Sequence, residues 1–193
     1  EIKKEVNQKI IKIGMPSAMQ MFFEVALFTG AIWLCGMIGT TSQAANQIAL
    51  SLASLTFMFA MGLSVTAMIR IGNQKGLNDF ITLRKVAISI FLLTIIIEVV
   101  FALLFVALHT SLPYIFVDIN DAENLTKNLQ VIAISANLLL VAAVFQISDG
   151  LQVVVLGALR GLQDAKIPMY ITFVAYWVIG FPISIYLGLE TEL

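Results

Sequence analysis

FQISDGLQVVVLGALRG, residues 145–161, places one acid in the middle of a long apolar segment. Asp149 is the only formally charged residue from Asn128 to Leu159, and Arg160 is the next charge along the chain. A helix rises about 1.5 Å per residue, so a helical Asp149 lies roughly 15 Å from the end of that segment. This depth is near the middle of a bilayer hydrocarbon core about 30 Å thick. An acid there is costly, and by default it marks the path of an ion or a substrate.

The composition is that of a membrane protein. The chain of 193 residues is 60% hydrophobic and 12% charged, with a mean hydropathy of +0.96. Soluble domains carry about 25% charged residues. The formal net charge of −1 gives no sign of a nucleic-acid partner, and the single cysteine excludes an internal disulfide. The one histidine leaves little material for a zinc-type site, and no cofactor is expected.

Recurring apolar runs predict an all-α membrane protein, a polytopic bundle of five transmembrane helices in a single domain over residues 1–193. The predicted spans are residues 13–37, 44–69, 86–108, 128–159 and 167–188. The connections are predicted as a charged helical lead-in at 1–12, a turn at 39–43, a loop at 70–85 and a partly helical surface segment at 109–127. The fourth span is longer than a bilayer needs, which indicates tilt or a protruding end.

Lysine and arginine are distributed very unevenly between the two sides of these spans. If the spans alternate in direction, ten of the eleven cations fall on one side. They are Lys3, Lys4, Lys9, Lys12, Arg70, Lys75, Arg84, Lys85, Arg160 and Lys166. Only Lys127 falls on the other side, with Asp118, Asp121, Glu123, Glu190 and Glu192. Because basic loops stay inside, we expect a multi-pass protein of the cell inner membrane with its N-terminus in the cytoplasm.

Three acids lie inside the predicted spans, at a common depth. Glu24, Glu98 and Asp149 are each about 11–13 residues from the basic flank of their span, or roughly 16–20 Å. Three carboxylates at one depth suggest that they face one cavity, which costs less than burying each of them separately. The alternative for each is a protonated carboxyl, or one hydrogen-bonded to a neighbouring helix. That alternative is strongest for Glu98, whose neighbours ILLTIIIEVVFALL are almost wholly apolar.

The other two acids have polar or aromatic company on their own helices. Gln20 precedes Glu24 by one turn, and Gln146 and Gln152 lie three residues to either side of Asp149. Phe145 sits one turn before Asp149. These residues are candidates to line the cavity, as is Glu98.

Small and polar residues also mark the second span, at Gln47, Ser51, Ser54 and Gly62. For them we favour close packing between helices over a role in the cavity.

Paired carboxylates in a low-dielectric cavity cannot both stay ionised without a cation. A proton or sodium can occupy the pair, and an organic cation competes for the same charge. One negative site with two mutually exclusive ligands is the physical basis of an antiporter.

Three stretches resemble one family. IGMPSAMQMFFEVALF (13–28), AANQIALSLASLTFMFAMGLSVTAMIRIGNQKG (44–76) and FQISDGLQVVVLGALRGLQDAKIP (145–168) are similar to the multidrug and toxic compound extrusion (MATE) transporters of the NorM-like type. The resemblance implies a twelve-helix transporter of two lobes, in which this chain matches helices seven to eleven of the second lobe. It also implies a coupling-cation site, Na⁺ or H⁺, at Glu24 and Asp149. Phe145 stands where some relatives have tyrosine, and Glu98 matches no motif of the family.

The expected function is therefore a cation-coupled multidrug efflux antiporter that exports organic cations by alternating access, a secondary transporter and not an enzyme. We expect the chain to be part of a longer transporter that also has a first lobe and a final helix. One alternative is a related flippase for lipid-linked saccharides, although such proteins meet phosphates with cations and the spans hold only acids. Another is a membrane subunit that serves a partner protein without transporting anything.

Overall fold

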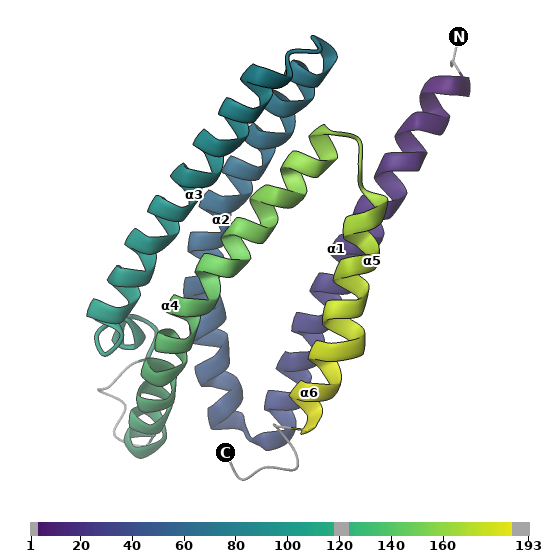
Figure 1. Ribbon diagram of the computed structural model, residues 1–193. Helices are drawn as coiled ribbons and strands as arrows, with labels where there is room; N and C mark the ends of the chain where they lie inside the picture. The colour runs from purple at the N-terminus through teal and green to yellow at the C-terminus, as the bar shows by residue number, and fades with distance from the viewer. Residues whose placement is uncertain (1–3, 118–123, 187–193) are drawn as a thin grey trace.

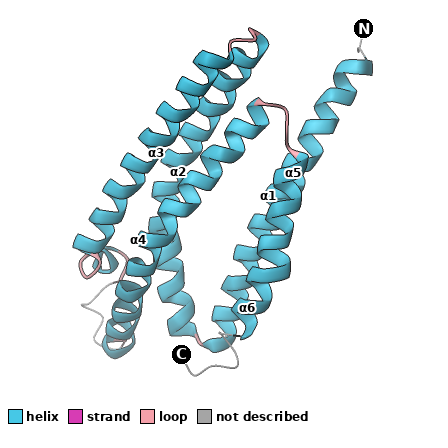
Figure 2. Cartoon of the chain, viewed as in Figure 1, coloured by secondary structure: helices cyan, strands magenta, loops and turns pink. Residues whose placement is uncertain are grey.

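The structure is a computed structural model that describes residues 4–117 and 124–186. Within these two ranges the chain is helical and has no strand. Its elements are α1 (Lys4–Ile38), α2 (Thr40–Gly76), α3 (Phe80–Leu108), the 3₁₀ helix η1 (Leu112–Ile115), α4 (Leu125–Gly161), α5 (Lys166–Phe173), the π-helix η2 (Val174–Gly180) and α6 (Phe181–Ile185). Among the described residues, five helical segments are long and apolar enough to cross a membrane, with α5, η2 and α6 counting as one (Figure 2). The predicted all-α membrane fold is confirmed.

The helices form two groups. α2, α3 and α4 pack on one another along their length, and α1 packs mainly with α5, η2 and α6 (Figure 1). The first group contains the larger core. The buried residues of α2 recur every three or four positions, so they lie on one face of that helix. They are Ala45, Ile48, Ala49, Leu52, Thr56, Ala60, Ser64, Ala67 and Ile71. Large apolar side chains on other faces, such as Leu92 and Leu103 of α3, are exposed, as expected for helices that contact lipid.

The helices extend further than the sequence predicted. α2 begins at Thr40 and ends at Gly76, so the expected turn at 39–43 is the single residue Gly39. The expected loop at 70–85 is also wrong, because only residues 77–79 separate α2 from α3. The apolar run ends where the bilayer ends, whereas backbone hydrogen bonding continues into water. Residues 1–3, 118–123 and 187–188, which the predicted segments included, lie outside the described residues.

The short α2–α3 turn is built from local hydrogen bonds. Asn78 has a positive φ of 56°, a conformation that asparagine tolerates well. Asp79 is the N-cap of α3, and its carboxylate accepts a hydrogen bond of 3.0 Å from the Thr82 backbone N–H. Hydrogen bonds from the Thr82 side chain and backbone hold the pKa of Asp79 below its ordinary value. Lys75 donates a hydrogen bond to the Leu162 carbonyl and so ties the ends of α2 and α4 together.

We expect Asp79→Ala to lower the thermal unfolding midpoint of the purified full-length protein slightly at pH 7, because α3 loses its cap. A carboxyl whose pKa is depressed by folding contributes stability above its unfolded pKa and loses that contribution in acid. The difference between variant and parent should therefore begin to shrink near the ordinary pKa of an aspartate, about 4, and should disappear only below the lowered pKa of the folded protein. Asp79→Asn keeps a capping side chain and should unfold like the parent at pH 7. If Asp79→Ala proved as stable as Asp79→Asn at pH 7, the cap would contribute nothing to the stability of the protein.

The last predicted span is interrupted by the π-helix η2. Pro182 follows it as the second residue of α6 and has no N–H to donate to the preceding turn. π-Helical turns are rare and often lie at functional sites. Two side chains of η2 reach neighbouring helices: Trp177 Nε1 donates to the Phe23 carbonyl of α1 at 3.3 Å, and Tyr176 accepts from Gln152 of α4 at 2.7 Å.

Candidate functional site

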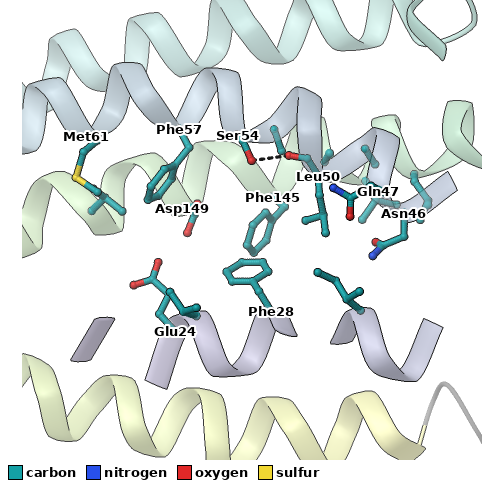
Figure 3. Close-up of a pocket in the computed structure, with 18 of the residues that line it drawn as sticks. Glu24, Phe28, Asn46, Gln47, Leu50, Ser54, Phe57, Met61, Phe145 and Asp149 are labelled. Atoms are coloured by element: carbon teal, nitrogen blue, oxygen red, sulfur yellow. Dashed lines mark hydrogen bonds between the residues drawn. The ribbon is translucent and has the colours of Figure 1, made fainter. Parts of the chain in front are cut away.

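A cavity of about 570 Å³ lies between α1, α2 and α4 (Figure 3). Its lining residues recur every three or four positions on each helix, which is the repeat of one helix face. Most of them are apolar or aromatic. The charged or polar residues of the lining are Glu24, Asn46, Gln47, Ser54, Asp149 and Arg160. A volume of this size suits a drug-sized molecule, since ligand pockets are commonly about 300–1,000 Å³.

Two of the three predicted acids line this cavity from opposite sides. Glu24 projects from α1 and Asp149 from α4, and Figure 3 shows their carboxylates pointing into the space between the helices. The two charges are close enough to interact electrostatically. Helix α4 brings Asp149 here because Phe145, Val153, Leu156 and Arg160 share its face and line the same cavity.

Arg160 belongs to the cavity, which the sequence analysis did not anticipate. The sequence predicts Arg160 at the basic flank of its span, but its side chain lines the cavity and interacts electrostatically with Glu24. Its Nη2 donates a hydrogen bond of 3.3 Å to Oε1 of Gln20 on α1. The spacing of eleven residues from Asp149, which is three turns of helix, would have revealed the shared face.

Gln20 does not line the large cavity, contrary to expectation. Gln20 is only 1% exposed and lies beside Arg160, because its side-chain oxygen accepts the hydrogen bond from the Arg160 guanidinium. Its place is therefore behind the charged end of the cavity wall.

The two glutamines beside Asp149 also point away from the large cavity. Three residues along a helix correspond to a rotation of about 60° from the starting face, so Gln146 and Gln152 lie on opposite sides of Asp149. Gln146 faces α2, where its side-chain amide forms a hydrogen bond of 2.9 Å with the Thr56 hydroxyl. Gln152 faces η2 and donates to Tyr176. Only Phe145, among the predicted companions of Asp149, lines the large cavity.

An aromatic pair crosses the middle of the cavity. Phe28 of α1 and Phe145 of α4 approach edge to face, with ring centroids 6.5 Å apart. In Figure 3 the pair stands between the acids on one side and the amides Asn46 and Gln47 on the other. The cavity therefore has a charged end and a neutral polar end, separated by aromatic rings.

The preferred interpretation of the polar residues on α2 is wrong. Gln47 and Ser54 line the cavity, and a side chain added at Gly62 would meet nothing within 4 Å. The hydroxyls of Ser51 and Ser54 donate hydrogen bonds within α2, to the backbone carbonyls of Gln47 and Leu50. Close helix packing is carried by other residues of α2, on the face toward α4.

Glu98, the third acid, does not line the large cavity either. It is 2% exposed and lines a separate small cavity of about 20 Å³, together with Asp149, Thr56 and Gln146. The expectation of three acids facing one cavity is corrected accordingly, because α3 lies behind α4 and presents Glu98 to the rear of that helix. Among the described residues, no group of three or more His, Cys, Asp or Glu side chains is placed to hold a metal ion.

Comparison with known proteins agrees with this architecture. A family model described as MatE matches residues 16–186. The chain belongs to the MATE family. The resemblance inferred from the sequence is thereby confirmed, together with its implied helical membrane fold.

Two relatives of this MATE chain carry the name "Probable multidrug resistance protein NorM". The protein from Agrobacterium fabrum is 37% identical over 176 residues, which cover 91% of this chain and 37% of that protein. The protein from Pasteurella multocida is 38% identical over 177 residues, which cover 92% of this chain and 36% of that protein. The chain thus spans little more than a third of the length of these curated relatives. The roles of Glu24 and Asp149 in cation binding stay predictions.

Proposed function

We propose that this MATE chain forms part of a cation-coupled efflux antiporter that exports organic cations by alternating access. The transporter is a secondary active one and has no enzymatic chemistry. Its coupling ion is sodium or a proton, and a further lobe of the same transporter supplies the opposite wall. The names of the NorM relatives, which refer to multidrug resistance, support this assignment.

The observation that carries the proposal is the position of Glu24 and Asp149 on opposite sides of one mainly apolar cavity. A carboxylate pair inside a membrane binds cations strongly because water does not screen its charge. A coupling ion and an organic cation compete for that charge, and a site that holds either one but not both couples their movements.

The charge balance of the cavity fits one monovalent ligand at a time. Glu24 and Asp149 contribute two negative charges when ionised, and Arg160 contributes one positive charge. The lining then carries a net charge of −1, which a single monovalent cation neutralises. Because Arg160 lies beside Glu24, Asp149 is the carboxylate with more charge free for the ligand.

The walls of the cavity suit organic cations of varied shape. Phe28, Phe57 and Phe145 offer ring faces, and Met21 and Met61 offer flexible side chains. Aromatic faces attract cations, and methionine adapts to ligands of different outline. Binding by these groups depends on charge and apolar surface, which is the pattern expected of a multidrug site.

We place the transporter in the cell inner membrane with the N-terminus of this chain in the cytoplasm. The start of α1, the α2–α3 turn and the α4–α5 connection lie at the same end of the bundle (Figure 1). Among described residues this end carries Arg70, Lys75, Arg84, Lys85 and Lys166. Basic residues favour the cytoplasmic side.

The test is ethidium efflux by the full-length protein in cells that lack their main efflux pumps. Cells loaded with ethidium should lose fluorescence faster than vector controls, and an imposed inward gradient of the coupling ion should accelerate the loss. A sodium pulse at constant pH and an acid pulse without sodium distinguish the two ions. Efflux that neither ion accelerates would contradict cation coupling. Absence of export for ethidium and for other cationic dyes would favour the flippase or partner-subunit interpretation.

A further inference from the structure

The small cavity behind Asp149 is built from polar groups that lack partners. Glu98 is 2% exposed and Gln146 is 4% exposed, yet Glu98 Oε1 and Gln146 Nε2 have no hydrogen-bond partner. Both side chains line the cavity, as do Asp149, Thr56 and Gly150. Buried polar atoms are nearly always satisfied, so two unsatisfied side chains around one cavity point to a ligand between them.

The geometry at Thr56 shows which atom of Gln146 is free. The Thr56 hydroxyl has one hydrogen but lies 2.8 Å from the Ala53 carbonyl and 2.9 Å from the Gln146 side-chain oxygen. Both bonds form if Thr56 donates to Ala53 and the amide is rotated, so that Gln146 Nε2 donates to Thr56. The unpaired position of Gln146 is then an oxygen. With the amide in this orientation, the small cavity is lined by two carboxylates, an amide oxygen and a hydroxyl oxygen, beside Ala53, Phe57, Phe145 and Gly150. These oxygens are ligands that hard cations prefer.

The size of this cavity restricts its ligand. About 20 Å³ is enough for one water molecule or one ion of similar size, and far too small for a drug. Asp149, Phe57, Phe145 and Ala53 line both this cavity and the large one. Asp149 therefore has the large cavity on one side and the small cavity on the other, and the charges of Glu98 and Asp149 interact.

We propose that Glu98 and Asp149 hold one dehydrated sodium ion in the small cavity, and that this ion competes with the exported cation for Asp149 from the opposite side. The proposal rests on the antiporter function given above and adds a separate place for its coupling ion. Sodium in the small cavity holds the Asp149 carboxylate beside Glu98, which reduces its attraction for the organic cation and favours release of that cation. An organic cation in the large cavity, in turn, draws Asp149 away from the ion.

Equilibrium binding of radioactive sodium to the purified full-length protein tests this site. Glu98→Gln keeps the shape of the side chain and removes its charge, so the sodium affinity should fall about tenfold or more, as for loss of a metal ligand or its support. Ethidium affinity, measured without sodium in the same preparation, should change less than about twofold, because Glu98 does not face the large cavity. Asp79→Asn, an acid changed in the α2–α3 turn, should leave both affinities unchanged.

A second variant tests the cavity while keeping every carboxylate. A Cβ at Gly150 would lie 2.5 Å from Glu98 Oε1, so Gly150→Ala fills the small cavity and displaces the carboxylate. Its sodium affinity should fall as in Glu98→Gln. Gly62→Ala is the matched control, since a Cβ there meets nothing within 4 Å. This pair keeps the proposal testable even if Glu98→Gln fails to fold.

Several outcomes would overturn the site. Parent-like sodium binding in both Glu98→Gln and Gly150→Ala would place the ion elsewhere, and loss only in Asp149→Asn and Glu24→Gln would place it between Glu24 and Asp149. A parent that exports ethidium with a proton gradient but binds no sodium would overturn the sodium site and leave the antiporter standing. Sodium binding that depends on Glu98, in a protein that exports no organic cation, would keep the site and refute the proposed function.

Discussion

Ethidium efflux driven by the coupling ion should fall to the level of cells without the transporter when Asp149 is replaced by asparagine. Asparagine has nearly the shape of aspartate but carries no charge, so the cavity keeps its volume and loses the carboxylate that faces Glu24. Without that charge, a cavity that still contains Arg160 beside Glu24 has no net attraction for cations. The exported cation is then no longer held, the small cavity loses one of the two carboxylates proposed to hold the coupling ion, and the exchange stops. The measurement is the initial rate of fluorescence loss after an ion pulse.

Glu24→Gln separates the two proposed positions of the ion. It should weaken ethidium binding, because the large cavity loses one of its two acids. It should weaken sodium binding less than Asp149→Asn does, because Glu98 and Asp149 still line the small cavity. Asp79→Asn serves as the control outside both cavities, and immunoblots of the membrane fraction verify equal amounts of each protein. Efflux by Asp149→Asn at the parental rate would assign Asp149 a structural role only.

The depth of the two cavity acids in the membrane could be predicted from their positions along the helices. The positions of Glu24 and Asp149 relative to their basic flanks placed them at one level, and the structure brings them to opposite walls of one cavity. Depth follows from counting residues, since the rise of a helix is constant. The direction in which a side chain points around its helix depends also on how the helices pack, and here the sequence analysis failed.

Gln146, Gln152 and Glu98 show this limit. Their spacing of three residues from Asp149 predicted that the two glutamines line the same cavity. Each of them instead forms a hydrogen bond with a neighbouring helix on its own side of α4. Glu98 has the predicted depth but faces the rear of α4, because α3 packs there and not against α1. Arg160 ends the apolar run, and that position alone predicted a place at the water boundary. Arg160 also lies on the cavity face of α4, which the end of an apolar run does not indicate.

The prediction with the largest effect on stability concerns the contact between α2 and α4. A Cβ at Gly157 of α4 would lie 2.3 Å from the backbone oxygen and 2.4 Å from the hydroxyl of Ser64 on α2. That hydroxyl donates a hydrogen bond of 2.7 Å to the Val153 carbonyl, so it joins the two helices where they are closest. Small residues permit such close approach in membrane helices. Gly157→Ala should therefore force the helices apart and destabilise the protein by about 1–3 kcal/mol or more.

The matched substitution Gly62→Ala on α2 should have the opposite sign. No atom lies within 4 Å of a Cβ at Gly62, and alanine in a helix is favoured over glycine by up to about 1 kcal/mol. Thermal unfolding of the full-length protein in detergent compares the two, and a Gly157→Ala variant as stable as Gly62→Ala would refute the close contact. Asp149 lies about two turns before Gly157 on α4. Thr56 of α2 and Gln146 of α4 both line the small cavity, so displacing α4 from α2 should also widen that cavity. Sodium binding should therefore weaken in Gly157→Ala and not in Gly62→Ala.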